Sequence, residues 1–192
     1  EAFGTGRGST LGRTSAHEVL LTRQFRTALR RLNPWMNDDH VREAENVLRA
    51  PQGQESLLAC NERKYELLRD GIPVSDRTPD GARTTRRARV FAFDAPEEND
   101  FLAVKEFTVQ GALYTRRADL VGFVDGVPLL FVECKKTNVA LRTGYEANYR
   151  DYLATILHLF HYNAFVLFSR GLESRIGTLG SAYEFFSEWK HL

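Results

Sequence analysis

The sequence predicts an α/β fold, an α+β arrangement in which helices flank a central mixed β-sheet. The first third of the 192-residue chain repeats apolar residues at helical spacing, whereas later segments are apolar runs of strand length. A further helical pattern separates the last two of these runs, as in a crossover connection. The order of helices, strand meander, crossover helix and strand therefore indicates one mixed-sheet domain that begins with a helical segment.

Three helices are expected in the N-terminal third, after a Gly-, Ser-, Thr- and Arg-rich stretch that predicts a flexible lead-in over residues 1–14. Their expected ranges are 15–32, 37–49 and 54–70. Ser15 and Glu18 match a capping box for the first helix, and Asn37 is a suitable cap for the second. Gly71 is expected to end the third helix.

The pattern changes to strands beyond residue 88. Apolar runs predict strands at 89–94, 101–109, 118–124 and 127–134. Asp125-Gly126 separates the last two runs, and this dipeptide predicts a tight hairpin between them. A helix at 145–160 and a strand at 163–168 are expected to complete the domain.

The composition excludes several classes of protein. With 43% hydrophobic and 27% charged residues, the chain is neither disordered nor fibrous, and no stretch reaches the length of a membrane span. Its 26 basic and 25 acidic residues give a net charge of +1, so total charge does not indicate a nucleic-acid partner. Two cysteines outside any paired motif predict a reduced, cytoplasmic protein. The chain lacks an initial Met and ends after an aromatic run, which predicts a fragment of a longer protein.

Charged residues stand where two expected strands should be apolar. Ionised groups in such positions are costly unless they are paired or bind a metal. The carboxylates of Asp119 and Glu133, with the carbonyl of Cys134, offer oxygen ligands that suit Mg²⁺. Lys135 is two residues from Glu133, so both side chains project from one face, where the lysine is placed to orient water or stabilise a transition state. A structural ion-pair cluster at a strand end is the alternative interpretation.

The register of the hairpin decides whether such a site can form. If the loop held only Asp125 and Gly126 and the strands were regular, Asp119 would face Val132 instead of Glu133. A shift of one residue is needed, so we expect an irregular turn, made by a three-residue loop or a bulge at Gly126. A regular hairpin with Asp119 turned away from Glu133 would remove the metal site.

These residues resemble the PD-(D/E)xK nuclease motif, and more closely the N-terminal nuclease region of the restriction (R) subunit of type I restriction–modification enzymes. The spacing of thirteen residues between Asp119 and Glu133 is a weak signal alone, but an ordered set of matches runs from about Ser15 onward. The set comprises Asn33-Pro34, Asn99-Asp100-Phe101, Arg116-Arg117-Ala118-Asp119, Asp125-Gly126-Val127-Pro128, Glu133-Cys134-Lys135, Leu159-Phe160-His161-Tyr162-Asn163 and Arg175-Ile176-Gly177-Thr178.

The resemblance implies a restriction-endonuclease-like core over about 70–171, within a single domain over 15–192, that hydrolyses phosphodiester bonds of double-stranded DNA with Mg²⁺. It implies that Asp119, Glu133 and Lys135 are catalytic and that the two carboxylates hold the metal with the Cys134 carbonyl. It further implies partners, the methylation and specificity subunits, and ATP-driven translocase domains after Leu192 that alone use ATP. Two other functions stay open: a stand-alone repair or resolvase-type nuclease, and a non-catalytic DNA-binding or assembly module.

The resemblance also implies supporting residues. Related nucleases carry Gln-x-x-x-Tyr on the helix after the site, and the aligned residues here are Asn148 and Tyr152; the shorter asparagine departs from that pattern. Glu18 is a further candidate metal ligand, with its capping role as the alternative.

The motif and its surroundings carry candidate DNA contacts and one further departure. Ala118 replaces the usual proline before the aspartate, which alters only the backbone constraint. Arg116 and Arg117 are candidate contacts to DNA phosphates, with a solvated strand end as the alternative. Arg86, Arg87 and Arg89 are weaker candidates of the same kind.

Overall fold

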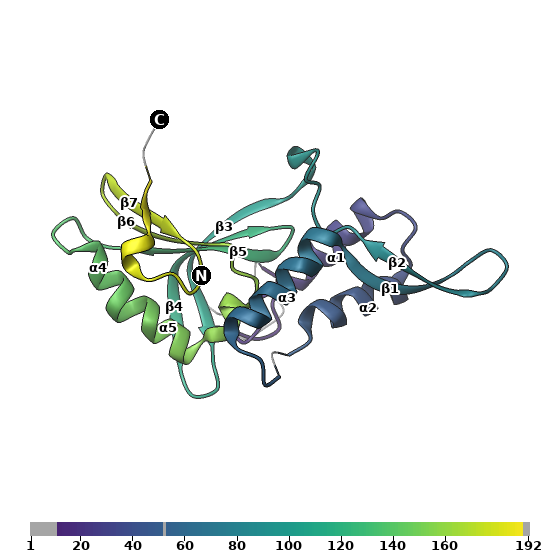
Figure 1. Ribbon diagram of the computed structural model, residues 1–192, viewed down its shortest axis with the longest axis horizontal. Helices are drawn as coiled ribbons and strands as arrows, with labels where there is room; N and C mark the ends of the chain where they lie inside the picture. Colours follow the sequence, from purple (N-terminus) through teal and green to yellow (C-terminus); the bar gives the residue numbers. More distant parts are fainter. Residues whose placement is uncertain (1–10, 52, 190–192) are drawn as a thin grey trace.

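The computed structural model describes residues 11–51 and 53–189, so residues 1–10 of the expected lead-in lie outside the described residues. Figure 1 shows a sheet with one helix pair beside it and a bundle of helices and a hairpin extending to one side. The helices are α1 (Thr22–Leu32), α2 (Asp38–Arg49), α3 (Leu57–Asp70), α4 (Leu141–Thr143) and α5 (Arg150–Thr155). The strands are β1 (Ile72–Arg77), β2 (Arg83–Ala88), β3 (Phe101–Gln110), β4 (Thr115–Val124), β5 (Val127–Cys134), β6 (Phe165–Arg170), β7 (Glu173–Gly177) and β8 (Ser187–Glu188).

The main sheet has six strands in the order β3-β4-β5-β6-β7-β8. Among the strands that the structure describes in this sheet, only the β5–β6 pair is parallel, and its neighbours pair antiparallel. The parallel pair requires a crossover, which α4, α5 and the turns around them supply. This is the mixed-sheet α/β architecture expected from the sequence, and β1 and β2 form a separate two-stranded sheet.

The first helix begins later than predicted. It starts at Thr22 with no side-chain cap, and Ser15 and Glu18 lie in a turn before it. The backbone N–H of Leu21 donates to the Gly126 carbonyl at 2.9 Å, which ties this entry segment to the β4–β5 turn instead of to a helix. The capping-box prediction for the first helix is therefore wrong, whereas Asn37 is the N-cap of α2, in a capping box that His40 completes.

The strand expected at 89–94 is also wrong, because asparagine side chains take its hydrogen bonds. Asn33 receives a hydrogen bond from the Arg89 N–H and donates to the Arg89 carbonyl, both at 2.8 Å. Asn99 does the same for Ala92, at 2.8 and 3.0 Å. These amides occupy the groups that a neighbouring strand would need. The strands in this part of the chain are instead β1 and β2, which the sequence pattern did not reveal.

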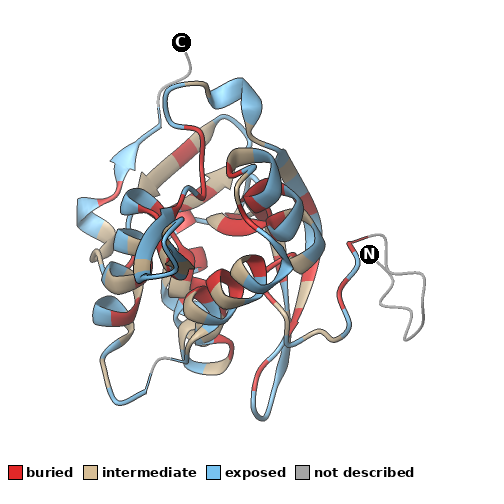
Figure 2. Cartoon of the chain, turned by 90° about the vertical axis from the view of Figure 1, so that its right-hand side faces the viewer, coloured by how far each residue is buried: buried red, intermediate tan, exposed pale blue. Residues whose placement is uncertain are grey.

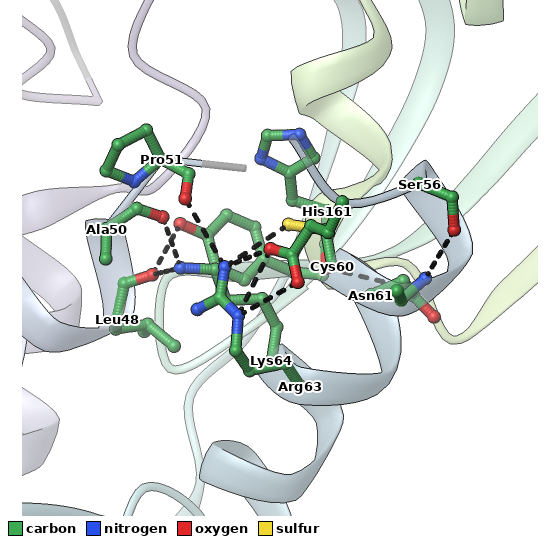
Figure 3. A network of polar contacts seen from close by, with 12 residues as sticks. Leu48, Ala50, Pro51, Ser56, Cys60, Asn61, Arg63, Lys64 and His161 are labelled. Carbon is green, nitrogen blue, oxygen red and sulfur yellow. Dashed lines mark hydrogen bonds and ion pairs between the residues drawn. The ribbon is translucent and has the colours of Figure 1, made fainter. Parts of the chain in front are cut away.

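A buried lysine joins α2 to α3 (Figure 3). Lys64 is fully buried, and its ammonium donates to the carbonyls of Leu48 and Ala50, the latter at 2.7 Å. Leu48 lies in the last turn of α2 and Ala50 is its C-cap, and carbonyls at a helix end have no partner within the helix. Asn61, one turn away on α3, donates to three carbonyls between Phe160 and Asn163. Through these hydrogen bonds, the polar side chains of α3 connect α2 with the segment before β6.

The crossover connection is shorter and less regular than the single helix expected at 145–160. Between α4 and α5 lies a π-helical turn, Gly144–Tyr149, and the helix ends at Thr155. A 3₁₀ helix, Leu157–Tyr162, then leads to β6. Other 3₁₀ turns span Pro96–Glu98 and Tyr183–Phe185.

The core lies between the sheet and the helices. Figure 2 shows buried residues on the inward sides of both, with exposed residues on the outer sides. Phe131 of β5 contacts the rings of Tyr149, Tyr152 and Phe160 at centroid distances of 5.2–6.0 Å, which packs the crossover segment onto this face of the sheet. Within the described residues, no helix has the length and apolarity needed to cross a membrane.

Candidate active site

A β-bulge gives the register that the site requires. The loop is a regular two-residue turn in which Asp125 and Gly126 both have positive φ, and Val124 pairs with Val127. The register then shifts between Phe123 and Gly122, so that Leu129 is the extra residue on β5. The predicted shift of one residue is thus present, but the prediction that it lies in the turn is wrong.

The Asp119 side chain of β4 bonds to the backbone of β5 at the point where the two strands diverge. The β4–β5 pairing ends at Leu120 and Val132, so the next position along β4 is Asp119, opposite Glu133. There the Asp119 Oδ2 accepts the backbone N–H of Cys134 at 2.8 Å. A carboxylate therefore replaces the backbone acceptor that a continued ladder would supply, and it lies beside Glu133 at the end of β5.

Glu133 and Lys135 form a close ion pair in a buried setting. Lys135 Nζ lies 2.6 Å from Glu133 Oε1, and the side chains are 15% and 1% exposed. Burial raises the pKa of Glu133, and the neighbouring Asp119 charge raises it further, whereas the hydrogen bond from Lys135 lowers it. The lysine thus opposes the cost of keeping a carboxylate ionised at this position.

One oxygen of this buried carboxylate has no protein partner. Glu133 Oε2 is buried and accepts no hydrogen bond. A buried acceptor without a partner is costly, so this atom together with Asp119 fits a site for a cation. Within residues 11–51 and 53–189, no cluster of three His, Cys, Asp or Glu side chains is arranged to hold a metal ion. A metal held here would take two side-chain carboxylates and complete its shell with backbone oxygen and water, as Mg²⁺ commonly does.

The two predicted supporting residues lie on the crossover helix. The Tyr152 hydroxyl donates to the carbonyl of Arg117, two residues before Asp119, at 3.0 Å. Burial raises the pKa of Tyr152 to about 12, and the charges of Glu133 and Asp119 act in the same direction, whereas a side-chain hydrogen bond from Asn148 lowers it. Tyr152 is therefore a protonated donor that fixes the start of β4, and Asn148 is hydrogen-bonded to it.

The two arginines before Asp119 differ in their freedom. Arg116 is held in a bidentate ion pair with Asp151, at 2.5 and 3.0 Å. Arg117 is 64% exposed and lies 3.5 Å from the exposed Glu106. Arg117 is thus the more available of the two for a phosphate.

Glu18 and the Cys134 thiol lie apart from this cluster. The Glu18 carboxylate accepts from the Thr14 N–H and hydroxyl at 3.0 and 2.8 Å and lies 3.5 Å from Arg49. It lines a separate pocket together with His17 and other residues of that region. Cys134 is exposed, because its side chain faces away from that of Glu133.

Gly144 is a residue of the site that the sequence pattern did not single out. A Cβ added to it would lie 3.2 Å from Lys135 Cε, 3.3 Å from Phe168 Cδ1 and 3.4 Å from Glu133 Cγ. Its φ of −60° and ψ of −41° are helical, so the backbone does not require glycine, and it is the close packing that favours glycine. A glycine directly before the helix expected at 145–160 was the available signal.

Comparison with known proteins places these residues in context. The sequence profile of the family described as "Type I restriction enzyme R protein N terminus" matches residues 3–185. The "Type I restriction enzyme HindI endonuclease subunit" of Haemophilus influenzae is 29% identical over 178 residues, which cover 90% of this chain and 16% of that protein. The "Putative type I restriction enzyme MjaIXP endonuclease subunit" of Methanocaldococcus jannaschii is 24% identical over 183 residues, 93% of this chain and 17% of that protein. The chain thus spans about a sixth of the length of these curated relatives.

Proposed function

Because the chain belongs to the family of type I restriction enzyme R protein N termini, we propose that it is the endonuclease domain of such a subunit and hydrolyses phosphodiester bonds of double-stranded DNA. The observation that supports this most is the cluster of Asp119, Glu133 and Lys135. Two carboxylates and one ammonium meet at the diverging ends of β4 and β5, and one buried carboxylate oxygen is free to bind a cation.

Each residue of the cluster has a separate task in this proposal. Asp119 and Glu133 hold a divalent ion, Mg²⁺, with the Cys134 carbonyl as a third protein ligand. When bound, Mg²⁺ lowers the pKa of a coordinated water and neutralises charge on the scissile phosphate. Lys135, kept in place by Glu133, orients the attacking water or stabilises the extra negative charge of the transition state.

The surrounding residues position this cluster and the substrate. Tyr152 and Asn148 fix the start of β4 through the Arg117 carbonyl, and so orient Asp119. The exposed guanidinium of Arg117, and to a lesser degree that of Arg116, contacts the DNA backbone. Glu18, occupied by Thr14 and Arg49, is not included in the metal site that we propose.

The wider context follows from the family. We propose that the domain works in the cytoplasm as part of an R subunit that assembles with methylation and specificity subunits, and that ATP is used only by translocase domains of the longer protein. The domain would then cut without choosing the sequence, because sequence selection belongs to a partner.

A plasmid-nicking assay tests the proposal with a matched pair of lysines. Lys135→Ala should lower the rate of Mg²⁺-dependent nicking by about 10²–10³-fold, the range for loss of one preorganised hydrogen-bond donor. Lys136→Ala removes a neighbouring lysine that is exposed and should leave the rate unchanged. Chelation of Mg²⁺ should stop cleavage in both. Equal rates in the two variants would refute the proposed mechanism, and no nicking by the parent chain or its full complex would favour the non-catalytic alternative.

A further inference from the structure

The β1–β2 hairpin carries an excess of positive charge that the whole chain does not show. Residues 72–88 contain four arginines and two aspartates, a net charge of +2 in a protein whose total is +1. Figure 1 shows this hairpin at the end of the long axis opposite α4, the helix beside the candidate active site. The excess charge is therefore local, and it lies far from the catalytic cluster.

The two faces of the hairpin differ in what they contact. Alternate strand residues point to opposite faces. Ile72, Val74 and Ala88 are buried and anchor one face on the core, where Arg86 also pairs with Asp76 at 3.2 Å. The other face carries the exposed residues Ser75, Arg77, Arg83, Thr85 and Arg87. That face has three guanidiniums, two hydroxyls and no carboxylate of its own.

Two of these arginines oppose each other directly. Arg77 and Arg83 are Cα partners across the hairpin, so their side chains share one face. Like charges in such positions repel and lower the stability of a strand pair. Among the described residues no carboxylate lies within 4.0 Å of either guanidinium. The hairpin therefore holds a repulsive pair that an external anion would neutralise.

In the groove beside the hairpin, the carboxylates have protein partners, whereas the two arginines have no carboxylate partner within the part of the chain that the structure describes. A groove of about 860 Å³ lies between α2 and the hairpin, and Arg77 and Arg83 line it. Its three carboxylates already have partners: Asp39 pairs with Arg42, Glu43 accepts from the Ser75 N–H and hydroxyl, and Asp76 lies near Arg86 and His40. The two arginines are thus the positive charges of the groove that the protein leaves available.

We propose that the Arg77–Arg83 face of the β1–β2 hairpin binds the phosphate backbone of duplex DNA, at a place separate from the catalytic cluster. Guanidiniums suit phosphate geometry, and a hydroxyl such as that of Thr85 is a common phosphate donor. A two-stranded ribbon also has dimensions that fit the major groove. The proposal rests on the proposed function only for the choice of DNA as the polyanion. The contact holds the duplex without reading its sequence, because backbone contacts carry no base information.

Fluorescence anisotropy with a labelled 40-base-pair duplex tests the proposal, in a Lys135→Ala background so that no strand is cut. Arg77→Gln/Arg83→Gln should weaken binding about fivefold or more at low salt and flatten the slope of log K against log salt by about 1.8, or 0.9 for each lost phosphate contact. Arg77→Lys/Arg83→Lys keeps both charges and should keep the slope. Circular dichroism and thermal melting check that the variants are folded, which is expected because both side chains are exposed.

A second double variant distinguishes the effect of the hairpin contact on DNA binding from the effect of net charge. Arg30→Gln/Arg69→Gln removes the same net charge, but these arginines are already paired with Asp38 and Asp70 at 2.7 and 2.6 Å, so the slope should change little. Equal losses in the two double variants, an unchanged slope for the hairpin variant, or no binding by the parent chain at low salt would each overturn the proposal. Failure of the proposed function has another readout. If the chain binds DNA through the hairpin but does not nick plasmid, the hairpin proposal holds and the nuclease proposal is refuted.

Discussion

Two buried charged residues, Lys64 in the helical region and Glu133 in the sheet, differ in whether the protein provides partners for their polar atoms. Lys64 is fully buried, donates to two helix-end carbonyls and lies 5.9 Å from the centre of the Tyr162 ring (Figure 3). Glu133 is as deeply buried, but only one of its oxygens has a partner. Burial favours the neutral form of each group: it lowers the pKa of Lys64 to about 8 and raises the pKa of Glu133.

The difference separates a structural charge from one available for chemistry. A buried polar group that closes a helix end contributes to the fold and has no capacity left for a ligand. A buried carboxylate with a free oxygen costs stability in the absence of a ligand, and functional sites are where such costs are commonly found. We therefore expect substitutions at Lys64 to affect stability and those at Glu133 to affect activity.

The largest effect is expected from Glu133→Gln. The amide keeps the shape but removes the charge that holds the metal and Lys135, so the nicking rate should fall about 10³-fold, equivalent to about 4 kcal/mol. Because the charge is costly to bury, the free energy of unfolding should change by less than about 1 kcal/mol. Plasmid nicking and urea denaturation measure the two quantities. A large loss of stability would show that Glu133 is a structural residue like Lys64.

Lys64→Met should give the opposite outcome. It removes the donor to Leu48 and Ala50 while keeping the apolar stem, and a buried acceptor left without a partner costs about 1–3 kcal/mol. We expect a loss of about 3 kcal/mol in the free energy of unfolding, with the cleavage rate of the folded fraction unchanged. Lys105→Met, at an exposed lysine of β3, is the matched control and should be neutral. A stable Lys64→Met variant would contradict the structural role.

Gly144→Ala tests how closely the crossover helix must approach the ion pair. Alanine is the better helix former by about 1 kcal/mol, which offsets crowding against Phe168. The added methyl meets Lys135 and Glu133, so the pair should move and single-turnover cleavage should slow about tenfold, with DNA affinity unchanged. An unchanged cleavage rate would mean that Lys135 tolerates displacement and that glycine is not needed here.

A change of pH should act on stability and not on the catalytic cluster. Burial lowers the pKa of both His158 and His161 to about 4, below the ordinary value of 6.5. Between these values the unfolded chain binds more protons, so their contribution to stability is present above pH 6.5 and is lost as pH falls toward 4. The urea concentration at the midpoint of unfolding should be lower at pH 5 than at pH 7. His158→Gln/His161→Gln should make this difference smaller. An identical pH dependence in the double variant would assign the loss to other groups.

The sequence was most informative where one local pattern determined the outcome. Asn37 caps α2 as predicted, Gly71 ends α3, and Asp125-Gly126 forms the two-residue turn. These features depend on a few neighbouring residues, so their chemistry is visible in the chain itself. The resemblance to type I R subunits, which the family comparison confirms, likewise rests on short motifs in a fixed order.

Where distant side chains compete for the backbone, prediction from the sequence was wrong. The apolar run at 89–94 looked like a strand, but Asn33 and Asn99 reach its backbone from other elements. Glu18 matched a capping box, yet its carboxylate is bound by Thr14 and Arg49. No periodicity of the local sequence reports such long-range partners.

The sequence by itself determined the family, the mixed-sheet architecture and the identity of Asp119, Glu133 and Lys135 as candidate site residues, because residue type and spacing are properties of the chain. It also required a register shift of one residue, since side chains alternate strictly along a strand. Only the tertiary structure decided that the bulge lies at Leu129, that Gly144 packs against the ion pair and that one oxygen of Glu133 stays free. Those outcomes depend on how strands and helices pack in space, where a displacement of one residue or one methyl group changes which atoms meet.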